Sequence, residues 1–148
     1  MEVDLSSHRR FFPIFSGLLL LLTLTISGCY EGYTASEGDP LKKYIEPEVF
    51  KTLVEKPDPS IWIIDVRPRS AYVDGHIPGA RSFPSSEVMA RLNQLPKDRY
   101  LIVYCETGGR AQMVIKKLLK KGYTRLMNWG GYTRWKWPYE KGEDKNHS

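Results

Sequence analysis

Apolar residues along the middle of the chain fall into short continuous runs that alternate with stretches of helical spacing. Ile61–Ile64 and Tyr100–Tyr104 are uninterrupted apolar runs, as expected of strands that are buried on both faces of a parallel sheet. Weaker runs at residues 80–83 and 125–128 predict two further strands. The alternation predicts an α/β fold with right-handed crossovers, in which ligands bind at the carboxyl ends of the strands.

Three segments are predicted to be helices. Apolar residues in 47–56 recur at helical spacing, and the Pro57-Asp58-Pro59 cluster ends that pattern. Residues 85–92 begin with serines, which are good helix N-caps. Residues 110–121 place apolar side chains on one face and lysines on the other, and Gly122 supplies the position after the helix.

The N-terminal segment predicts export. Arg9-Arg10 precede a mostly apolar run from Phe11 to Ile26, which is the layout of a signal peptide. The following Ile26-Ser27-Gly28-Cys29 resembles a bacterial lipobox, which implies cleavage before Cys29 and lipid attachment to that residue. An uncleaved membrane anchor is the alternative, although spanning a bilayer takes about 20 apolar residues. We expect a bacterial envelope protein, lipid-anchored to a membrane with its domain on the periplasmic or extracytoplasmic side.

The expected organisation has four parts and one folded domain. They are a lipoprotein signal peptide at 1–28, the lipidated cysteine with a flexible tether at 29–43, the domain at 44–140 and a polar tail at 141–148. The tether is inferred from its small polar residues, which show no periodicity.

The formal net charge of +5 is moderate. Removing residues 1–28 leaves it unchanged, because that segment carries two basic and two acidic residues. Such a charge suits anionic small molecules or a membrane surface, but it is too small to indicate nucleic acid. We expect a monomer with no nucleic-acid partner.

Cys105 is the strongest candidate for chemistry. The chain has two cysteines, so lipidation of Cys29 would leave Cys105 without a disulfide partner in an oxidising compartment. Cys105 follows a predicted strand and precedes Gly108, Gly109 and Arg110 at the start of a predicted helix. A helix N-terminus and a guanidinium both favour a thiolate, and glycines at positive φ let N–H groups curl around an anion. The alternative is a small buried hydrophobic residue.

No group of residues has the spacing of a metal site. His76 has no cysteine or histidine nearby in the sequence, and we expect it to close the turn at 74–80 rather than act as an acid or base. We therefore expect neither a metal nor an organic cofactor.

Three further motifs accompany the cysteine loop: Asp65-Val66-Arg67, then Asp74-Gly75-His76-Ile77-Pro78-Gly79-Ala80, and finally Gly130-Gly131 followed by Trp135. In this order they resemble the rhodanese-like domain family from about Tyr44 to Trp137. The resemblance implies a sheet of about five parallel strands with helices on both faces. It also implies a cysteine that accepts a sulfane sulfur, becomes a persulfide and passes the sulfur on, a role that falls on Cys105.

The resemblance further implies which residues bind the substrate. They are the loop residues Glu106, Thr107, Gly108, Gly109 and Arg110, together with Asp65 and Arg67. Four residues separate Cys105 from Arg110, whereas cysteine phosphatases of related fold have five, so the loop favours sulfur chemistry over phosphate chemistry. Glu106 and Ala111 depart from the commonest pattern, and the charge of Glu106 opposes an anionic donor such as thiosulfate.

We predict a sulfurtransferase that takes sulfur from thiosulfate or a persulfide and gives it to a thiol or cyanide, with a protein sulfur partner as a further option. One alternative is a rhodanese-fold module that carries or senses sulfur, or binds a partner, without turnover. Another is a thiol redox protein, which would need a resolving cysteine.

Overall fold

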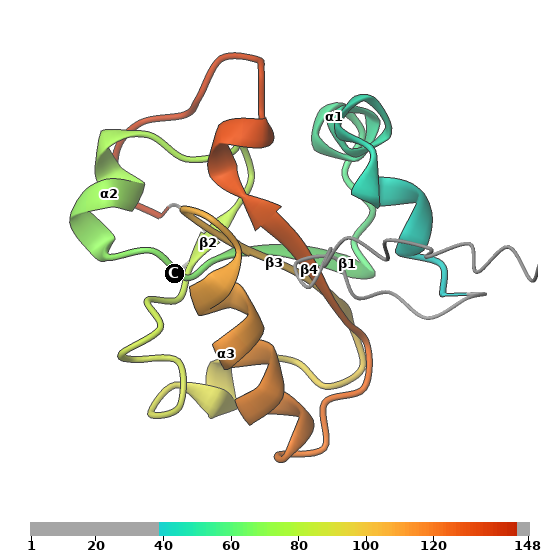
Figure 1. Ribbon diagram of the computed structural model, residues 1–148, viewed down its shortest axis with the longest axis vertical. Coiled ribbons are helices and arrows are strands. Elements are labelled where there is room, and N and C mark those ends of the chain that lie inside the picture. Colours follow the sequence, from blue (N-terminus) through green and yellow to red (C-terminus); the bar gives the residue numbers. More distant parts are fainter. Residues whose placement is uncertain (1–38, 145–148) are drawn as a thin grey trace, which may run out of the picture.

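Four parallel strands form the sheet, in the order β2-β1-β3-β4 (Figure 1). They are β1 (Ile61–Asp65), β2 (Arg81–Ser82), β3 (Tyr100–Cys105) and β4 (Leu126–Gly131). The computed structural model describes residues 39–144. The predicted α/β fold with a parallel sheet is confirmed, although the described residues form four strands where the resemblance implied about five.

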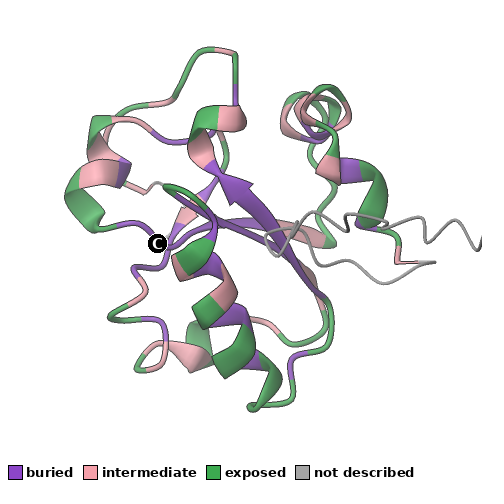
Figure 2. Ribbon diagram, in the orientation of Figure 1, coloured by how far each residue is buried: buried purple, intermediate pink, exposed green. Residues whose placement is uncertain are grey.

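Helices cover both faces of the sheet. The helix α3 (Gly109–Leu119) covers one face, and α1 (Pro47–Glu55), α2 (Arg69–Asp74) and the 3-10 turn η1 (Lys42–Ile45) cover the other (Figure 1). The alternation of side chains along β3 divides the core accordingly. Leu101 and Val103 pack on the α3 side, whereas Ile102 packs on the α1 side. The strands are therefore buried on both faces, as Figure 2 shows.

The expected helix at 85–92 is wrong. This segment forms a series of turns, followed by the 3-10 turn η2 (Leu92–Gln94). Val88 N–H bonds to the carbonyl four residues back, but the N–H groups of Glu87 and Ala90 bond three residues back, so no regular helix develops. Tertiary bonds fix both ends of the segment instead, from Ser85 N–H to the Val66 carbonyl at 3.1 Å and from the Tyr123 hydroxyl to the Leu92 carbonyl at 3.0 Å. The sequence pattern also missed α2, and β4 extends three residues past its expected end.

Packing extends beyond the expected domain limits of 44 and 140. Leu41 is fully buried in the core beside α1. At the other end, Asp144 accepts a hydrogen bond from Ser82 N–H at 2.8 Å, and Gly142 N–H donates to the Val73 carbonyl at 2.9 Å. The predicted signal peptide and Cys29 lie outside the described residues, as does most of the predicted tether.

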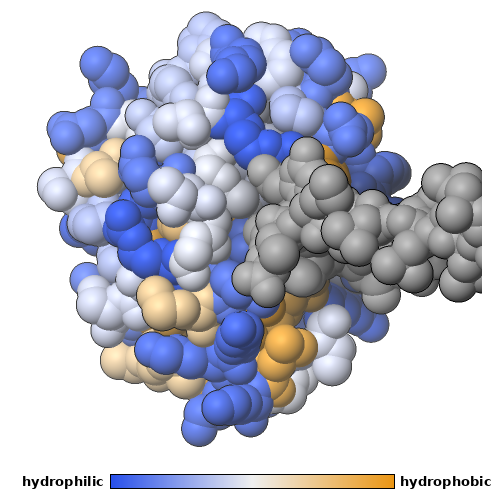
Figure 3. Space-filling view, viewed as in Figure 1, coloured by the Kyte–Doolittle hydropathy of each residue, from blue (hydrophilic) through white to orange (hydrophobic). Residues whose placement is uncertain are grey.

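The outer surface is mainly polar. The face seen in Figure 3 is largely hydrophilic, with small separate hydrophobic groups. Met113 and Leu119 on α3 and Tyr139 near the C-terminus are the large apolar side chains exposed among residues 39–144. None of the helices in this part of the chain is long and apolar enough to cross a membrane.

Candidate functional site around Cys105

Cys105 is the last residue of β3, at the carboxyl edge of the sheet where the sequence placed it. Its side chain is 1% exposed and lies on the α3 side of the sheet. The backbone N–H of Gly108 points at the sulfur and donates to Sγ at 3.1 Å. The chain after the cysteine therefore turns back and places a hydrogen-bond donor against the sulfur atom.

Gly108 makes this turn possible. It is the N-cap residue of α3 and has φ of 99°, in the left-handed region that glycine adopts without strain. Gly109 is the first residue of the helix and does not have a positive φ. Of the two loop glycines expected to permit positive φ, Gly108 alone adopts it. The sulfur thus lies next to the N-terminus of an eleven-residue helix, where the helix dipole favours negative charge.

The glycines at the end of β4 let the cysteine loop pack closely on the sheet. A Cβ atom on Gly131 would lie 2.6 Å from the carbonyl oxygen of Glu106 and 3.3 Å from Cα of Thr107. A Cβ atom on Gly108 would lie 3.1 Å from Cα of Gly130. Two backbones therefore meet where a side chain would not fit, which explains the Gly130-Gly131 motif physically.

Asn128 was missed as a site residue by the sequence analysis. It is fully buried in β4, at an irregularity where the pairing with β3 shifts by one residue. Its Nδ2 donates to the carbonyl of Gly108 and to Oε1 of Gln112, both at 3.1 Å, and its Oδ1 accepts from Gly130 N–H at 2.9 Å. The sequence signal that could have identified Asn128 is a polar residue inside an otherwise apolar strand.

Asp65 and Arg67 form a buried ion pair, with the two residues 0% and 2% exposed. Arg67 donates to both carboxylate oxygens of Asp65, with the shortest contact 2.7 Å from Nη2 to Oδ2, and also to the carbonyl of Gly75 at 2.7 Å. Burial opposes the charge of Arg67, but hydrogen bonding to Asp65 and its charge outweigh burial, so the pKa of Arg67 is raised. These contacts give both residues a structural role, and substrate binding by them stays a prediction.

Two tyrosines surround this ion pair. The guanidinium of Arg67 lies 4.0 Å from the ring centre of Tyr132, and Tyr104 accepts a hydrogen bond from Ile77 N–H at 3.2 Å. Burial raises the pKa of Tyr104 well above its ordinary value, and the charge and hydrogen bonding of Asp65 act in the same direction. Tyr104 is therefore held as a neutral phenol, on the face of the sheet opposite to Cys105.

The remaining predicted site residues form the outer part of the loop. Glu106 and Thr107 are exposed, and Arg110 is partly exposed in the first turn of α3. Within residues 39–144, the side chain of Arg110 makes no hydrogen bond or ion pair. Glu106 lies close enough to Arg67 for its charge to help raise the pKa of that residue. The loop therefore presents one acidic and one basic group next to the buried sulfur.

The ring of His76 contacts Tyr72 rather than the cysteine loop. Its ring stacks on Tyr72 with centroids 3.7 Å apart, and Nδ1 donates to the Tyr72 carbonyl at 2.8 Å. Its backbone pairs with that of Glu140 in both directions at 2.9 Å. These contacts agree with the expected structural role. No group of three or more metal-binding side chains occurs among the residues described.

The model of the rhodanese-like domain family matches residues 46–137. The chain belongs to this family. The match covers the whole sheet, the Cys105 loop and the glycine motif of β4, so the rhodanese-like resemblance seen in the sequence is confirmed.

Curated relatives of this rhodanese-like chain include sulfurtransferases. A protein named sulfurtransferase from Allochromatium vinosum is 32% identical over 76 residues, which cover 51% of this chain and 71% of the relative. The thiosulfate sulfurtransferase GlpE of Coxiella burnetii is 31% identical over 85 residues, covering 57% and 78%. Matches to two Bacillus subtilis proteins span 52% and 59% of those relatives, so the chain shares part of their length. Sulfur transfer is thus the chemistry named among its relatives.

Solved rhodanese structures share the fold. The Alr3790 protein of Anabaena sp. has 31% sequence identity and a TM-score of 0.59, with 65% of this chain and 79% of the other covered. A structure described as rhodanese with anions from E. coli has 32% identity and a TM-score of 0.51, covering 55% of this chain and 99% of the other.

Proposed function

We propose that the protein is a sulfurtransferase in which Cys105 accepts a sulfane sulfur and passes it on. The observation that carries the proposal is the contact of 3.1 Å between Gly108 N–H and Cys105 Sγ at the N-terminus of α3. An N–H group in this position stabilises negative charge on the thiolate before reaction and near the persulfide afterwards. Membership of the family and relatives named sulfurtransferase support the same chemistry.

The proposed cycle has two steps, uptake of the sulfur by Cys105 and its release to an acceptor. The thiolate of Cys105 attacks the outer sulfur of thiosulfate, the S–S bond of the donor breaks, and sulfite leaves with the bonding electron pair. With an organic persulfide as donor, a thiolate leaves instead. An acceptor thiolate or cyanide then attacks the outer sulfur of the cysteine persulfide and regenerates the Cys105 thiolate, giving a new persulfide or thiocyanate.

The loop residues have distinct parts in this cycle. Arg110 is available for an anionic donor, because its guanidinium is not engaged within the described residues and offers a forked set of donors. Thr107 and Gly109 are exposed beside it, at the outer edge of the loop. Asp65 and Arg67 form a buried ion pair that also binds the Gly75 carbonyl, and the charge of Glu106 acts on Arg67. No step needs a metal or an organic cofactor.

A second candidate function is a sulfur carrier or partner-binding module without rapid turnover. The exposed carboxylate of Glu106 beside Cys105 favours it, because like charge slows the approach of an anionic donor. A carrier would still form the Cys105 persulfide, and would then release sulfur to a specific protein partner rather than to cyanide.

Intact mass of residues 30–148 after exposure to thiosulfate or a small persulfide tests the proposal. All buried core side chains that the structure describes lie between Leu41 and Trp135, so this fragment retains the fold. We expect a gain of one sulfur mass that cyanide removes and that Cys105→Ser lacks. Absence of the adduct with every donor, from folded protein, would refute the sulfurtransferase proposal. An adduct that cyanide removes slowly and in a single turnover would favour the carrier.

We also propose that Cys29 is lipidated and tethers the domain to a membrane of the bacterial envelope. Support comes from the sequence, in which Arg9-Arg10, the apolar run and the lipobox-like Ile26-Ser27-Gly28-Cys29 follow in order. Labelled palmitate should enter the full-length protein expressed in a bacterium, and Cys29→Ala should abolish the label. Label in Cys29→Ala, or export without lipid, would contradict the tether.

A further inference from the structure

The charges of this protein are unevenly distributed along its sequence. No aspartate or glutamate occurs from 107 to 139, whereas eight basic residues do: Arg110, Lys116, Lys117, Lys120, Lys121, Arg125, Arg134 and Lys136. Since the whole chain has 22 basic and 17 acidic residues, the remainder has 14 basic and 17 acidic ones. A net charge of +8 in one segment therefore contrasts with a net charge of −3 in the rest of the chain.

The exposed side of α3 carries most of this positive charge (Figure 2). Arg110 lies in the first turn, and four exposed lysines, here called the α3 lysines, lie in the last turn or just after it: Lys116, Lys117, Lys120 and Lys121. Among the residues described, none of these five side chains makes a hydrogen bond or an ion pair. Lys97 adds a cation at the same end of the helix, with its Nζ 5.4 Å from the ring centre of Tyr123.

Carboxylates of the neighbouring segments lie next to other groups. Glu87, in the turns that pack against α3, accepts a hydrogen bond from Arg91 Nη1 at 3.3 Å. Asp98 lines a small hollow with Arg99, and the charge of Glu106 acts on the buried ion pair. These three carboxylates therefore do not balance the charge of α3.

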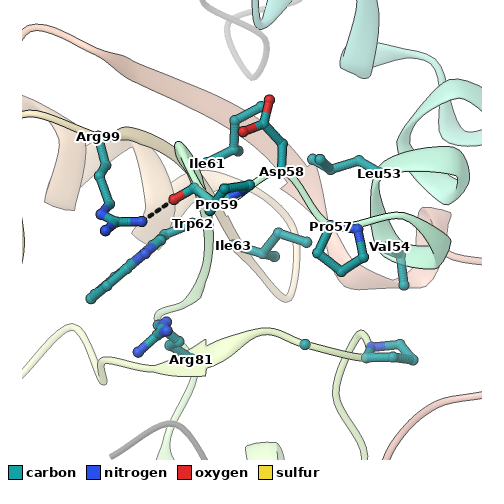
Figure 4. A pocket seen from close by; sticks show the side chains of 12 residues that line it. Leu53, Val54, Pro57, Asp58, Pro59, Ile61, Trp62, Ile63, Arg81 and Arg99 are labelled. Carbon is teal, nitrogen blue, oxygen red and sulfur yellow. Dashed lines mark hydrogen bonds between the residues drawn. The ribbon is translucent and has the colours of Figure 1, made fainter.

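The arginines at the β2 edge of the sheet have a different environment. Arg99 donates to the Pro59 carbonyl, and Arg81 lies 3.6 Å from the ring centre of Trp62 (Figure 4). Asp144 also lies close enough to Arg81 to favour its charge. Cations that are open to a partner are thus gathered on α3 rather than at this edge.

Exposed apolar side chains lie among the cations of α3. Met113 is 57% exposed and Leu119 is 51% exposed. Met113 lies one turn after Arg110 and one turn before the first two α3 lysines, so cations are its neighbours on the helix surface. An exposed apolar side chain bordered by charged ones has the layout of the centre and rim of a protein–protein interface.

A purely local role does not account for this pattern. Cations at the C-terminal end of a helix stabilise it through the helix dipole, which suffices to explain the lysines of the last turn. The same dipole disfavours Arg110 at the N-terminal end, and it gives no reason for an exposed Met113. Both residues lie in the half of α3 that follows the cysteine loop, so a surface that binds them is also next to Cys105.

The entry of the chain favours a protein partner over a lipid surface. The described residues begin at Asp39, and Leu41 packs beside α1 on the face of the sheet opposite to α3 (Figure 1). A lipid at Cys29 would therefore hold the domain from the face that α3 does not cover. α3 would remain accessible to a protein outside the bilayer.

We propose that the exposed side of α3 docks an acidic protein that exchanges sulfur with Cys105, an inference that rests on the proposed function. Carboxylates of the partner pair with Arg110 and the α3 lysines, and an apolar site of the partner receives Met113. The eleven residues of α3 span about 16 Å, which an extended segment of about five residues matches.

The docked partner exchanges sulfur in a step that needs no further reactant. The thiolate of Cys105 attacks the outer sulfur of a persulfide on the partner, the S–S bond breaks, and a thiolate of the partner leaves with the bonding electron pair. In the reverse direction, that thiolate attacks the outer sulfur of the Cys105 persulfide. Charge pairing along α3 raises the local concentration of the partner's sulfur at the loop.

Binding of a fluorescent peptide to residues 30–148 carrying Cys105→Ser tests docking without the chemistry. The probe has one cysteine, a short glycine spacer and a run of glutamates matched in length to α3, and the control peptide has glutamines in their place. At low salt we expect the acidic peptide to bind about tenfold more tightly in fluorescence anisotropy. The difference should vanish at high salt, because the paired charges are exposed.

Matched variants locate the binding surface. Lys116→Gln/Lys120→Gln should weaken binding of the acidic peptide about fivefold, since it removes two exposed charges from α3. Lys42→Gln/Lys43→Gln should have little effect, because it makes the same change of net charge at exposed positions of η1, on the other face of the sheet. Met113→Gln should weaken binding about threefold without any change of charge.

Sulfur transfer separates this inference from the proposed function. Once Cys105 carries sulfur, intact mass should show transfer to the acidic peptide about fivefold faster than to the glutamine peptide. Lys116→Gln/Lys120→Gln should lose this advantage and keep the wild-type rate with free cysteine. If Cys105 took up no sulfur, the proposed function would fail, while the anisotropy measurement would still decide whether α3 docks an acidic chain.

Three outcomes would overturn the inference. They are equal binding of the two peptides, equal losses in Lys116→Gln/Lys120→Gln and Lys42→Gln/Lys43→Gln, and transfer to both peptides at one rate. Vesicles that contain phosphatidylglycerol serve as the competing partner. If they bind through the α3 lysines while the acidic peptide does not, the surface is one for lipid, and the inference of a protein partner is wrong.

Discussion

The side-chain amide of Asn128, in β4, donates a hydrogen bond to the carbonyl oxygen of Gly108 at 3.1 Å. Gly108 is the same residue whose N–H points at the sulfur of Cys105. One buried side chain thus fixes the peptide unit that follows the sulfur donor, and it also bonds to Gln112 in the first turn of α3. The loop is positioned by a strand to which it is not adjacent in sequence.

Replacing Asn128 with alanine should loosen the loop. The change leaves the buried Gly130 N–H without its partner, while the Gly108 carbonyl keeps its bond from Gln112 N–H, and this costs about 1–3 kcal/mol in the free energy of unfolding. Sulfur uptake by Cys105 should slow about tenfold. Denaturant unfolding and the rate of persulfide formation measure the two effects. Gln112→Ala removes one of these bonds and should cost less than about 1 kcal/mol. Wild-type uptake by folded Asn128→Ala would contradict the positioning role.

A methyl group at Gly131 should displace the cysteine loop. Its Cβ would lie 2.6 Å from the Glu106 carbonyl oxygen, and backbone atoms cannot move aside as a flexible side chain can. We expect Gly131→Ala to lose most sulfur uptake while the far end of the sheet remains folded. Gly75→Ala is the control, because Gly75 lies outside the cysteine loop, its φ of 167° is extended backbone, and its Cβ would meet only an ordinary contact of 3.5 Å with Tyr139. If both variants accept sulfur at the same rate, close packing on β4 does not matter.

Local sequence patterns predicted the parts of the fold that local physics determines. Continuous apolar runs gave β1 and β3, and one-sided spacing gave α1 and α3 to within two residues at each end. The prediction of a helix at 85–92 was wrong because tertiary bonds, from Ser85 N–H to Val66 and from the Tyr123 hydroxyl to Leu92, fix this segment in turns. The six residues of α2 are too few to show a helical period.

The site, like the fold, has a part that local sequence predicts and a part that tertiary packing determines. Cys105, Gly108 and the start of α3 are close in sequence, so their arrangement could be predicted. Asn128 acts across 20 residues, and the clash that excludes a side chain at Gly131 depends on how β4 meets the loop. Such contacts arise from tertiary packing, and a single sequence gives no direct signal for them beyond a polar residue in an apolar strand.

Breaking the buried ion pair should destabilise the fold strongly. Asp65→Asn leaves Arg67 charged and buried without its counter-ion, which should cost about 3–5 kcal/mol in the free energy of unfolding. The double variant Asp65→Asn/Arg67→Met should recover part of this loss, because it removes the stranded charge. Arg69→Ala breaks the exposed pair with Glu143 and should cost less than about 1 kcal/mol. Urea unfolding compares the three, and equal losses for Asp65→Asn and Arg69→Ala would contradict the prediction.

Buried tyrosines should make the protein sensitive to alkali. Burial raises the pKa of Tyr104, and burial with nearby carboxylates raises that of Tyr72, whereas tyrosine in the unfolded chain titrates near pH 10. Their stabilisation is therefore complete below about pH 10 and is lost as the pH rises towards the folded pKa. Unfolding free energy should fall from about pH 10 upward, and Tyr104→Phe should flatten this slope. Tyr100→Phe, at a partly exposed position, should leave it unchanged. A slope that Tyr104→Phe does not alter would disprove the assignment.

Removing the charge of Glu106 should change the preference among sulfur donors. Thiosulfate carries two negative charges and is repelled by the exposed carboxylate, so Glu106→Gln should speed its reaction with Cys105 about threefold to fivefold at low salt. Cysteine persulfide, with less net charge, should gain less. The ratio of the two rates, measured by intact mass over time, should approach the wild-type ratio at high salt. Glu48→Gln, at an exposed position in the first turn of α1, controls for overall charge. An unchanged ratio in Glu106→Gln would show that this carboxylate does not act on the donor, and would remove the observation that favours a carrier.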